Sequence, residues 1–261
     1  MSVDARPILS CKSLRVSVPG RCLVNELDLT LNPGELIAVL GQNGTGKSLT
    51  LQTLAGLRRP DRGNVLLGEA DIFASRRQDV ARRLALLPQV VDDIFPATVM
   101  DTALIGRHPH VGHLRWESAE DFAIAATALQ TMGLDELAER DILTLSGGER
   151  RRLALAQVLT QAPDIYLLDE PTNHLDPQHQ LDAMRVFRRA ADTGSGIVAT
   201  LHDVNLAVRF ADRCLLLHGD GRWELGPCTA VLNEEGLSEL FATPMETVEW
   251  RSHSLFVAGG P

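Results

Sequence analysis

The chain has 261 residues, with 25 basic and 34 acidic side chains and a formal net charge of −9. Hydrophobic residues make up 44% of it and charged residues 23%, a balance that excludes disordered and collagen-like chains. The acidic balance argues against general binding to a nucleic-acid backbone, which needs a basic surface. No apolar run approaches the roughly 18 residues that cross a bilayer, and Met1–Ser10 lacks an apolar signal core. We therefore expect a globular protein of the cytosol that binds no nucleic acid.

Extended and helical patterns alternate along most of the chain. Two extended segments, residues 8–18 and 23–31, flank a Pro-Gly turn. Short apolar runs then predict strands buried on both faces, at residues 35–40, 165–168, 196–200 and 214–217. Helical patterns fall between them, at residues 47–57, 178–192 and 204–211. This alternation predicts an α/β fold with a mainly parallel sheet and an N-terminal antiparallel β portion.

The middle of the chain carries a different pattern. Residues 98–132 read as helical, with the clearest amphipathic stretch at Glu117–Met132, and no buried-strand signal interrupts them. We expect residues 90–160 to form a helical insertion in a core made of residues 1–89 and 161–261. Near the end, residues 247–251 and 254–257 are expected to pair as a hairpin. No internal repeat is visible, so a single domain is expected.

A glycine-rich segment at residues 41–48, Gly-Gln-Asn-Gly-Thr-Gly-Lys-Ser, fits the pattern G-x-x-x-x-G-K-[ST] between a predicted strand and a predicted helix. The glycines let backbone N–H groups surround a phosphate, and the helix N-terminus adds about half a positive charge. Lys47 reaches the β- and γ-phosphates, and the Ser48 hydroxyl holds Mg²⁺. A plain glycine turn is the alternative, but a chance match has a probability of roughly 1%. The predicted nucleotide-binding residues are Gly41, Asn43, Gly44, Thr45, Gly46, Lys47, Ser48 and Leu49.

Two acidic residues follow the apolar run Ile165–Leu168. Ligands bind beyond the carboxyl ends of parallel strands, so this pair is expected beside the phosphate loop. Asp169 suits a magnesium ligand, and Glu170 suits a group that orients or deprotonates an attacking water. The alternative, a solvated strand end, leaves the pairing with the phosphate loop unexplained. The two segments together predict hydrolysis of a nucleoside triphosphate.

With these motifs the chain resembles the ATP-binding subunits of ABC transporters, and it does so over nearly its whole length. The segment Leu145-Ser-Gly-Gly-Glu149 looks like that family's signature sequence. At a helix start, its hydroxyl and N–H groups form a second anion site, although a simple helix cap is the alternative. The resemblance implies an ATPase that uses Mg²⁺ with ATP and packs head to tail with a second copy. Each copy's Ser146, Gly147, Gly148 and Glu149 would then cover the ATP held by the other.

Further matches follow in the family's order. Gln89 is similar to the glutamine that touches Mg²⁺ and the attacking water, and His202 to the histidine that contacts the γ-phosphate. Asp176, in the segment Asn173-His-Leu-Asp176, resembles the aspartate at the dimer seam. The resemblance thus implies that Glu170, His202 and Gln89 are catalytic. It also implies that Ser48, Gln89 and Asp169 hold the metal.

Some positions depart from the family's pattern or invite another reading. The family stacks adenine on an aromatic residue, and the aligned position here is Val16, which leaves selectivity for ATP over GTP open. Arg150, Arg151 and Arg152 after the signature are interpreted as a solvated face or a partner contact. The histidines of the insertion and of the loop after Glu170 are interpreted as loop residues rather than metal ligands, at positions His108, His110, His113 and His174.

Several segments resemble one subgroup of the family more specifically than the family as a whole. Residues 98–110, 171–176, 202–207 and 240–248 resemble ATPases of importers for iron–siderophore complexes, haem and cobalamin. This resemblance implies a membrane permease that contacts the helical insertion, a substrate-binding protein, and a location on the cytoplasmic face of the inner membrane. The alternatives are an ABC ATPase of another transporter, including an exporter, and a soluble ABC ATPase that acts on ribosomes or DNA. A P-loop kinase would leave the signature segment unexplained.

Overall fold

The computed structural model describes residues 7–90, 96–112, 115–250 and 253–259. Its main sheet has the strand order β10-β9-β3-β8-β7-β6, and only β10 runs antiparallel to its neighbour. The strands are β3 (Leu36–Leu40), β6 (Leu84–Leu87), β7 (Ile165–Leu168), β8 (Gly196–Thr200), β9 (Arg213–Leu217) and β10 (Trp223–Pro227). Every residue of β3, β7 and β8 is buried, as expected for strands covered on both faces. The predicted α/β fold with a mainly parallel sheet is confirmed.

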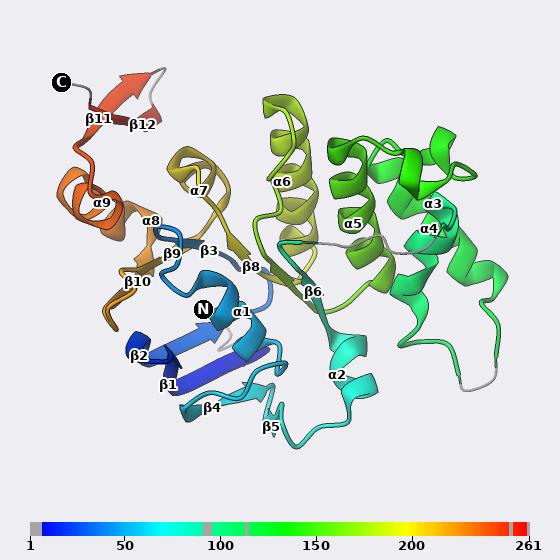
Figure 1. The fold of residues 1–261 in the computed structure, drawn as a ribbon, viewed down its shortest axis with the longest axis horizontal. Coiled ribbons are helices and arrows are strands. Elements are labelled where there is room, and N and C mark those ends of the chain that lie inside the picture. The colour runs from blue at the N-terminus through cyan, green and yellow to red at the C-terminus, as the bar shows by residue number, and fades with distance from the viewer. Residues whose placement is uncertain (1–6, 91–95, 113–114, 251–252, 260–261) are drawn as a thin grey trace, which may run out of the picture.

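A second sheet, with the order β2-β1-β4-β5, is antiparallel throughout and lies under one face of the main sheet (Figure 1). Its strands are β1 (Leu9–Val18), β2 (Arg21–Leu31), β4 (Arg62–Leu67) and β5 (Ala70–Asp71). Helix α1 (Lys47–Leu54) joins the same core, because Leu51 and Leu54 pack in one cluster with Ile37 and Val39 of β3. This sheet confirms the predicted N-terminal antiparallel portion.

The opposite face of the main sheet is covered by helices. Leu36, Ala38 and Leu40 of β3 face a cluster that includes Phe187 of α6 (Pro177–Asp192), while the alternate residues of the strand face the antiparallel sheet. Helix α7 (Val204–Phe210) contributes to the same cluster. The predicted helices at residues 47–57, 178–192 and 204–211 are all present, with boundaries that differ by a few residues.

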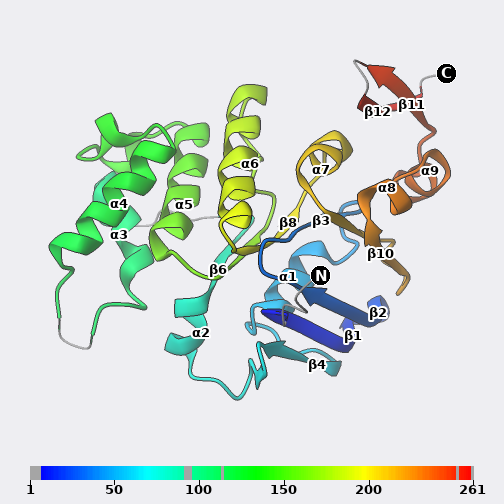
Figure 2. The same ribbon diagram turned by 180° about the vertical axis from the view of Figure 1, so that it is seen from behind.

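Helices gather at one end of the molecule between β6 and β7, and the C-terminal hairpin lies at the other end (Figures 1 and 2). The helical end contains α3 (Val99–Leu104), α4 (Ala119–Thr131) and α5 (Gly147–Gln161), joined by 3-10 turns at Ile105–Arg107, Asp135–Leu137 and Ile142–Thr144. A short α2 (Arg77–Arg83) precedes β6. The C-terminal part holds α8 (Cys228–Val231), α9 (Glu234–Phe241), β11 (Met245–Trp250) and β12 (His253–Ala258). β11 and β12 pair antiparallel, so the predicted hairpin is confirmed.

Strand β6 was not among the predicted strands. It pairs in parallel with β7, with Leu84 opposite Ile165, and forms the edge of the main sheet. The chain leaves this strand through Pro88 and reaches Gln89 at the carboxyl edge of the sheet. Within the described residues, no helix has the length and apolar character needed to traverse a bilayer.

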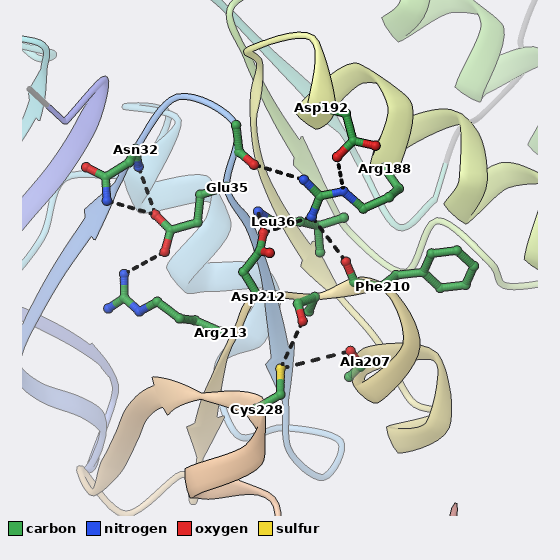
Figure 3. A network of polar contacts seen from close by, with 12 residues as sticks. Asn32, Glu35, Leu36, Arg188, Asp192, Ala207, Phe210, Asp212, Arg213 and Cys228 are labelled. Atoms are coloured by element: carbon green, nitrogen blue, oxygen red, sulfur yellow. Dashed lines mark hydrogen bonds and ion pairs between the residues drawn. The ribbon is translucent and has the colours of Figure 1, made fainter. Parts of the chain in front are cut away.

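Ion pairs and hydrogen bonds connect the elements at the amino-terminal edge of the main sheet (Figure 3). Arg188 of α6 pairs with Asp192 and with Asp212, both at 2.8 Å, and donates to the carbonyl of Gly34 at 2.9 Å. Asp212 in turn accepts the N–H of Leu36 at 2.8 Å, where β3 begins. These contacts tie α6 to the starts of β3 and β9.

Candidate active site

The glycine-rich loop turns sharply between β3 and α1. Gly44 and Gly46 have φ angles of +77° and +103°, in the region that glycine adopts without steric cost. A Cβ on Gly41 would lie 2.5 Å from the carbonyl oxygen of Leu217 and 2.8 Å from Oγ1 of Thr45, so no larger residue fits there. Thr45 itself donates to the carbonyl of Gln42 at 2.9 Å. The conformation of the loop at the N-terminus of α1 therefore depends on its glycines.

Lys47 lies buried at the start of α1. Its ammonium donates to the carbonyls of Gly41 at 2.7 Å and of Gln42 at 3.1 Å, so it spans the loop. Burial lowers the pKa of Lys47, and the nearby carboxylates of Glu170 and Asp169 partly offset that effect. A fixed cation surrounded by loop N–H groups is the arrangement that binds phosphates.

Three side chains contact the carboxylate of Glu170. His202 Nε2 lies 2.8 Å from Glu170 Oε1, and Gln89 Nε2 donates to Glu170 Oε2 at 3.0 Å. Asn173 also donates to Oε2 through its side-chain amide. The structure thus brings Glu170, His202 and Gln89 together. Asn173 was not predicted as a site residue, although its position three residues after Glu170 in the same turn was the available signal.

Asp169 and Glu170 are fixed by the neighbouring strand. The hydroxyl of Thr200, at the end of β8, donates to Asp169 Oδ1 at 2.8 Å and accepts the N–H of Glu170 at 2.7 Å. Both acids are nearly inaccessible, with 4% and 5% of their surface exposed. Their burial beside Lys47 gives the carboxyl edge a compact set of opposite charges.

A cleft of about 630 Å³ lies over the phosphate loop. Its walls contain Asn43, Gly44, Gly46, Lys47, Ser48, Leu49, Gln89, Glu170, Asn173 and His202, together with Val18, Arg21 and Leu23 of the antiparallel sheet. Most of the predicted nucleotide-binding residues and all three predicted catalytic residues therefore share one cleft. That cleft is open enough and polar enough to take a nucleoside triphosphate.

The predicted signature residues, Ser146 to Glu149, are not among the residues that line the cleft. Ser146 caps α5, its side chain accepting from the N–H of Glu149 while the Glu149 carboxylate accepts from the N–H of Ser146 at 2.7 Å. This capping box lowers the pKa of Glu149, mainly through hydrogen bonding to Ser146. Gly147 lines a second, smaller cavity of about 210 Å³ with Gln89, Arg151 and His174, and Lys47 is not among the residues that line it. Asp176 is exposed and caps α6, accepting from the N–H of His179 at 2.9 Å.

The structure contradicts the interpretation of Arg151. We expected a solvated face or a partner contact, but only 6% of Arg151 is exposed, and its guanidinium donates to backbone carbonyls beside the site. Arg150 is exposed, as expected for its position. The reason is helical geometry: the residue five positions after Ser146 faces the core side of α5, whatever its charge.

The position assigned to the missing adenine-stacking aromatic was also wrong. Val16 is completely buried in the core between the two sheets, so its side chain reaches no ligand. Val18, two residues further along β1, lines the cleft together with Arg21 and Leu23. Strand β1 is bulged, so its inward-facing residues are first Leu9 and Cys11 and then Leu14 and Val16, whereas Val18 at the end of the strand is exposed.

The histidines outside the cleft have varied surroundings. His110 Nε2 lies 2.9 Å from the carbonyl of Gln161, His108 lies in the same turn, and His174 is exposed in the loop after Glu170. His113 lies outside the described residues. Among the described residues, no three His, Cys, Asp or Glu side chains are grouped so that they could hold a metal ion.

The chain is similar to known proteins over most of its length. Residues 24–173 match the family model described as ABC transporter. The chain is 38% identical over 95% of its length to 96% of the hemin import ATP-binding protein HmuV of Rhodopseudomonas palustris (strain HaA2). It is 35% identical over 89% of its length to 87% of the achromobactin transport ATP-binding protein CbrD of Dickeya dadantii (strain 3937).

A solved structure of a metal-chelate type ABC transporter in an inward-facing conformation contains a similar chain. The TM-score is 0.85 at 29% identity, over 97% of this chain and 98% of that one. A bacterial Atm1-family exporter with ATP bound has a TM-score of 0.77 at 23% identity, over 93% of this chain and 42% of that one, and shows the fold alone. The phosphate loop, the matched family model and these relatives lead to one conclusion: the chain belongs to the ATP-binding subunits of ABC transporters.

Proposed function

We propose that this ATPase powers the import of an iron chelate, either haem or a siderophore complex. The observation that carries the enzymatic part is the Glu170 carboxylate, held by His202 and Gln89 in the cleft that also contains Lys47. The substrate class is supported by the relatives, whose names state hemin import and achromobactin transport. Cobalamin, which the sequence left open, has no support from these names, and we leave it out of the proposal.

The roles proposed for the residues rest on their positions and on the family resemblance. Lys47 and the loop N–H groups bind the β- and γ-phosphates, and the signature of a second copy covers the same ATP. Glu170 accepts a proton from the attacking water or orients it, because its carboxylate lies at the cleft wall and is aimed by two donors. His202 contacts the γ-phosphate and loses this contact when the phosphate is released. Hydrolysis removes the group that bridges the two copies, so ATP and ADP favour different states of the pair.

The oxygen donors at the cleft suit Mg²⁺. Ser48 and Gln89 line the cleft, and Asp169 lies at the end of β7 beside Glu170. A hydroxyl, an amide and a carboxylate are hard oxygen ligands of the kind that Mg²⁺ prefers. Bound with ATP, the ion would neutralise charge that develops on the phosphates. We therefore propose Ser48, Gln89 and Asp169 as its ligands, directly or through water.

The nucleoside is proposed to lie against the antiparallel sheet. Val18, Arg21 and Leu23 line the cleft next to the phosphate loop. The guanidinium of Arg21 is fixed by a hydrogen bond from Nε to the carbonyl of Gly219 at 2.7 Å. A planar cation held in this way offers a face on which a base can stack, in place of an aromatic ring.

The assembly is proposed from the family resemblance and the position of the signature. Ser146 and Asp176 are both exposed and lie outside the cleft, where a second copy packed head to tail would meet them. We treat residues 90–160 as the helical insertion that contacts a membrane permease. The subunit is then peripheral, on the cytoplasmic face of the inner membrane, and acts indirectly with a substrate-binding protein.

The proposal is tested by isolating the assembly from native membranes in mild detergent. The bait is Glu170→Gln with ATP, which is expected to retain the closed pair, and partners are identified by mass spectrometry. A polytopic permease in stoichiometric yield, together with binding of haem or a ferric siderophore by the associated substrate-binding protein, is the expected result. Recovery of ribosomal or DNA-bound proteins without a permease would overturn the transport function and leave the ATP site standing.

A further inference from the structure

The backbone of Glu170 has an unusual conformation. Its φ angle is +50°, in the left-handed region that residues with a side chain rarely adopt. A strained backbone of this kind persists only when surrounding contacts hold it, and such contacts are common at active sites. The conformation also decides where the carboxylate points. The groups that hold this peptide are therefore candidates for a role in catalysis.

Two side chains hold the backbone of Glu170 from opposite sides. Thr200 Oγ1 accepts its N–H at 2.7 Å, and a guanidinium nitrogen of Arg151 donates to its carbonyl at 2.6 Å. The same nitrogen of Arg151 donates to the carbonyl of Asp169 at 2.5 Å. The peptide groups on both sides of the strained residue are thus fixed by polar side chains from α5 and β8.

Arg151 also holds the segment that carries Gln89. Its other terminal nitrogen donates to the carbonyls of Pro88 at 3.0 Å and of Gln89 at 3.4 Å. Gln89 is one of the donors that aim the Glu170 carboxylate. One planar guanidinium therefore sets both the strained peptide and the loop that contacts its side chain. Its fork of donors suits this arrangement, whereas an ammonium is a compact point charge with three rotatable donors.

The position of Arg151 is energetically unfavourable, because its charged guanidinium is buried. The side chain is buried, and its Nε has no hydrogen-bond partner within the described part of the chain. Burial lowers the pKa of Arg151, while the charges of Asp169 and Glu170 raise it. A purely structural contact between α5 and β7 would be satisfied by an apolar side chain, which avoids the cost of burying a cation. The observed arrangement points to a requirement for the carbonyl contacts themselves.

We propose that Arg151 is a positioning residue for ATP hydrolysis: its guanidinium fixes the backbone of Asp169 and Glu170 so that the Glu170 carboxylate faces the reacting phosphate. This inference rests on the proposed role of Glu170. Arg151 does not itself line the cleft and contacts the cleft residues Gln89 and Glu170 through their backbone carbonyls, so it acts through the residues that it holds.

The test compares full-length Arg151→Met with Arg152→Met. Arg152 is the next residue of the same helix and donates to the carbonyls of Met132 and Gly133, away from the cleft, so it controls for loss of a charged carbonyl contact. Arg151→Met is expected to lower kcat about 10- to 100-fold, the effect of a misplaced catalytic group. Its Kd for ATP is expected to stay unchanged. Arg151→Lys should restore part of kcat, and Arg152→Met should retain it. A kcat for Arg151→Met equal to that of Arg152→Met would overturn the proposal.

A double variant separates positioning from a general effect on the fold. If Arg151 acts through the carboxylate, Arg151→Met lowers the residual rate no further in the Glu170→Gln background. A full additional loss in that background would overturn the proposal. Should Arg151→Met fail to fold, Thr200→Val tests the second contact, with Thr200→Ser as its control; equal kcat for these two would count equally against it. Wild-type turnover by Glu170→Gln alone would instead refute the proposed role of Glu170.

Discussion

The two edges of the main sheet use polar groups in opposite ways. At the amino-terminal edge, Arg188 has two carboxylates and two carbonyls as partners, and Glu35 pairs with Arg213 at 2.9 Å (Figure 3). At the carboxyl-terminal edge, the buried Lys47 donates to two loop carbonyls, and Glu170 has a strained backbone. The charges at the first edge are paired with one another within the chain, whereas we propose that those at the second edge interact with the charge of a bound nucleotide. The contrast indicates that unfavourable features, such as backbone strain, are concentrated at the candidate site.

The largest expected effect is at the carboxyl edge. Glu170→Gln removes the proton acceptor and keeps the size of the side chain, so we expect steady-state turnover to fall about 10²- to 10⁴-fold. Binding of ATP and pairing of two copies should be retained. Phosphate release measured alongside nucleotide binding checks this result. Rapid turnover by the variant would show that Glu170 is not the catalytic group, and that its strained backbone has a cause other than catalysis.

At the amino edge we expect the reverse, a loss of stability with little loss of activity. Arg188→Met removes charge-assisted contacts to Asp192, Asp212 and Gly34, and should lower the free energy of unfolding by about 1.5–3 kcal/mol. Arg185→Met is the matched control, since Arg185 forms an exposed pair with Asp182 on the same helix, worth about 0.3–0.5 kcal/mol. Denaturant unfolding and kcat per folded molecule are measured together. A drop in kcat would mean that the amino edge also shapes the site.

A smaller effect is expected where the base is proposed to bind. Arg21→Ala removes the guanidinium face and should weaken ATP binding by about 0.5–2 kcal/mol. Fluorescent-nucleotide titrations with ATP and GTP provide the measurement, and Arg21→Lys serves as the control that keeps the charge without the planar face. Unchanged affinity for both nucleotides would place the base elsewhere in the cleft.

The smallest expected effect is a pH dependence at Lys47. Its pKa lies below the ordinary value of 10.5 because burial disfavours the ammonium. Binding of phosphates requires the charged form, so ATP affinity is expected to fall as pH rises, and to fall at lower pH than for an ordinary lysine. Lys47→Arg should show a flat profile, because a guanidinium keeps its proton at pH values where an ammonium loses it. Identical profiles for both proteins would rule out Lys47 as the titrating group.

Much of this contrast was predictable from sequence, for identifiable reasons. The phosphate loop and the acids after Ile165–Leu168 are local signals, because glycine spacing and apolar runs directly reflect backbone and burial. The parallel core and the antiparallel portion followed from the same runs. Strand β6 was missed because a short Leu-Ala-Leu-Leu segment after a helix carries no β-branched residue and resembles a helical end.

The remaining misses depend on tertiary contacts. Arg151 receives its role from carbonyls at Pro88, Gln89, Asp169 and Glu170, which come from distant segments and leave no mark in a helix rich in arginine. Val16 was assigned by counting residues before the phosphate loop, and counting does not show which face of a strand a residue occupies. Residue types predicted the site where its function depends on local backbone geometry, as in the phosphate loop. They did not predict it where a side chain binds the backbone of a distant segment, as Arg151 does.

Helix α5 carries two of the features described above within a short distance. Ser146 caps its start and Arg151 lies little more than one turn later, about 7.5 Å along the axis at 1.5 Å per residue. In the proposed pair, the first faces the neighbour's nucleotide and the second fixes the acid that serves the chain's own nucleotide. One helix would then contact both nucleotides of the pair, the neighbour's through Ser146 and the chain's own through Arg151 and Glu170.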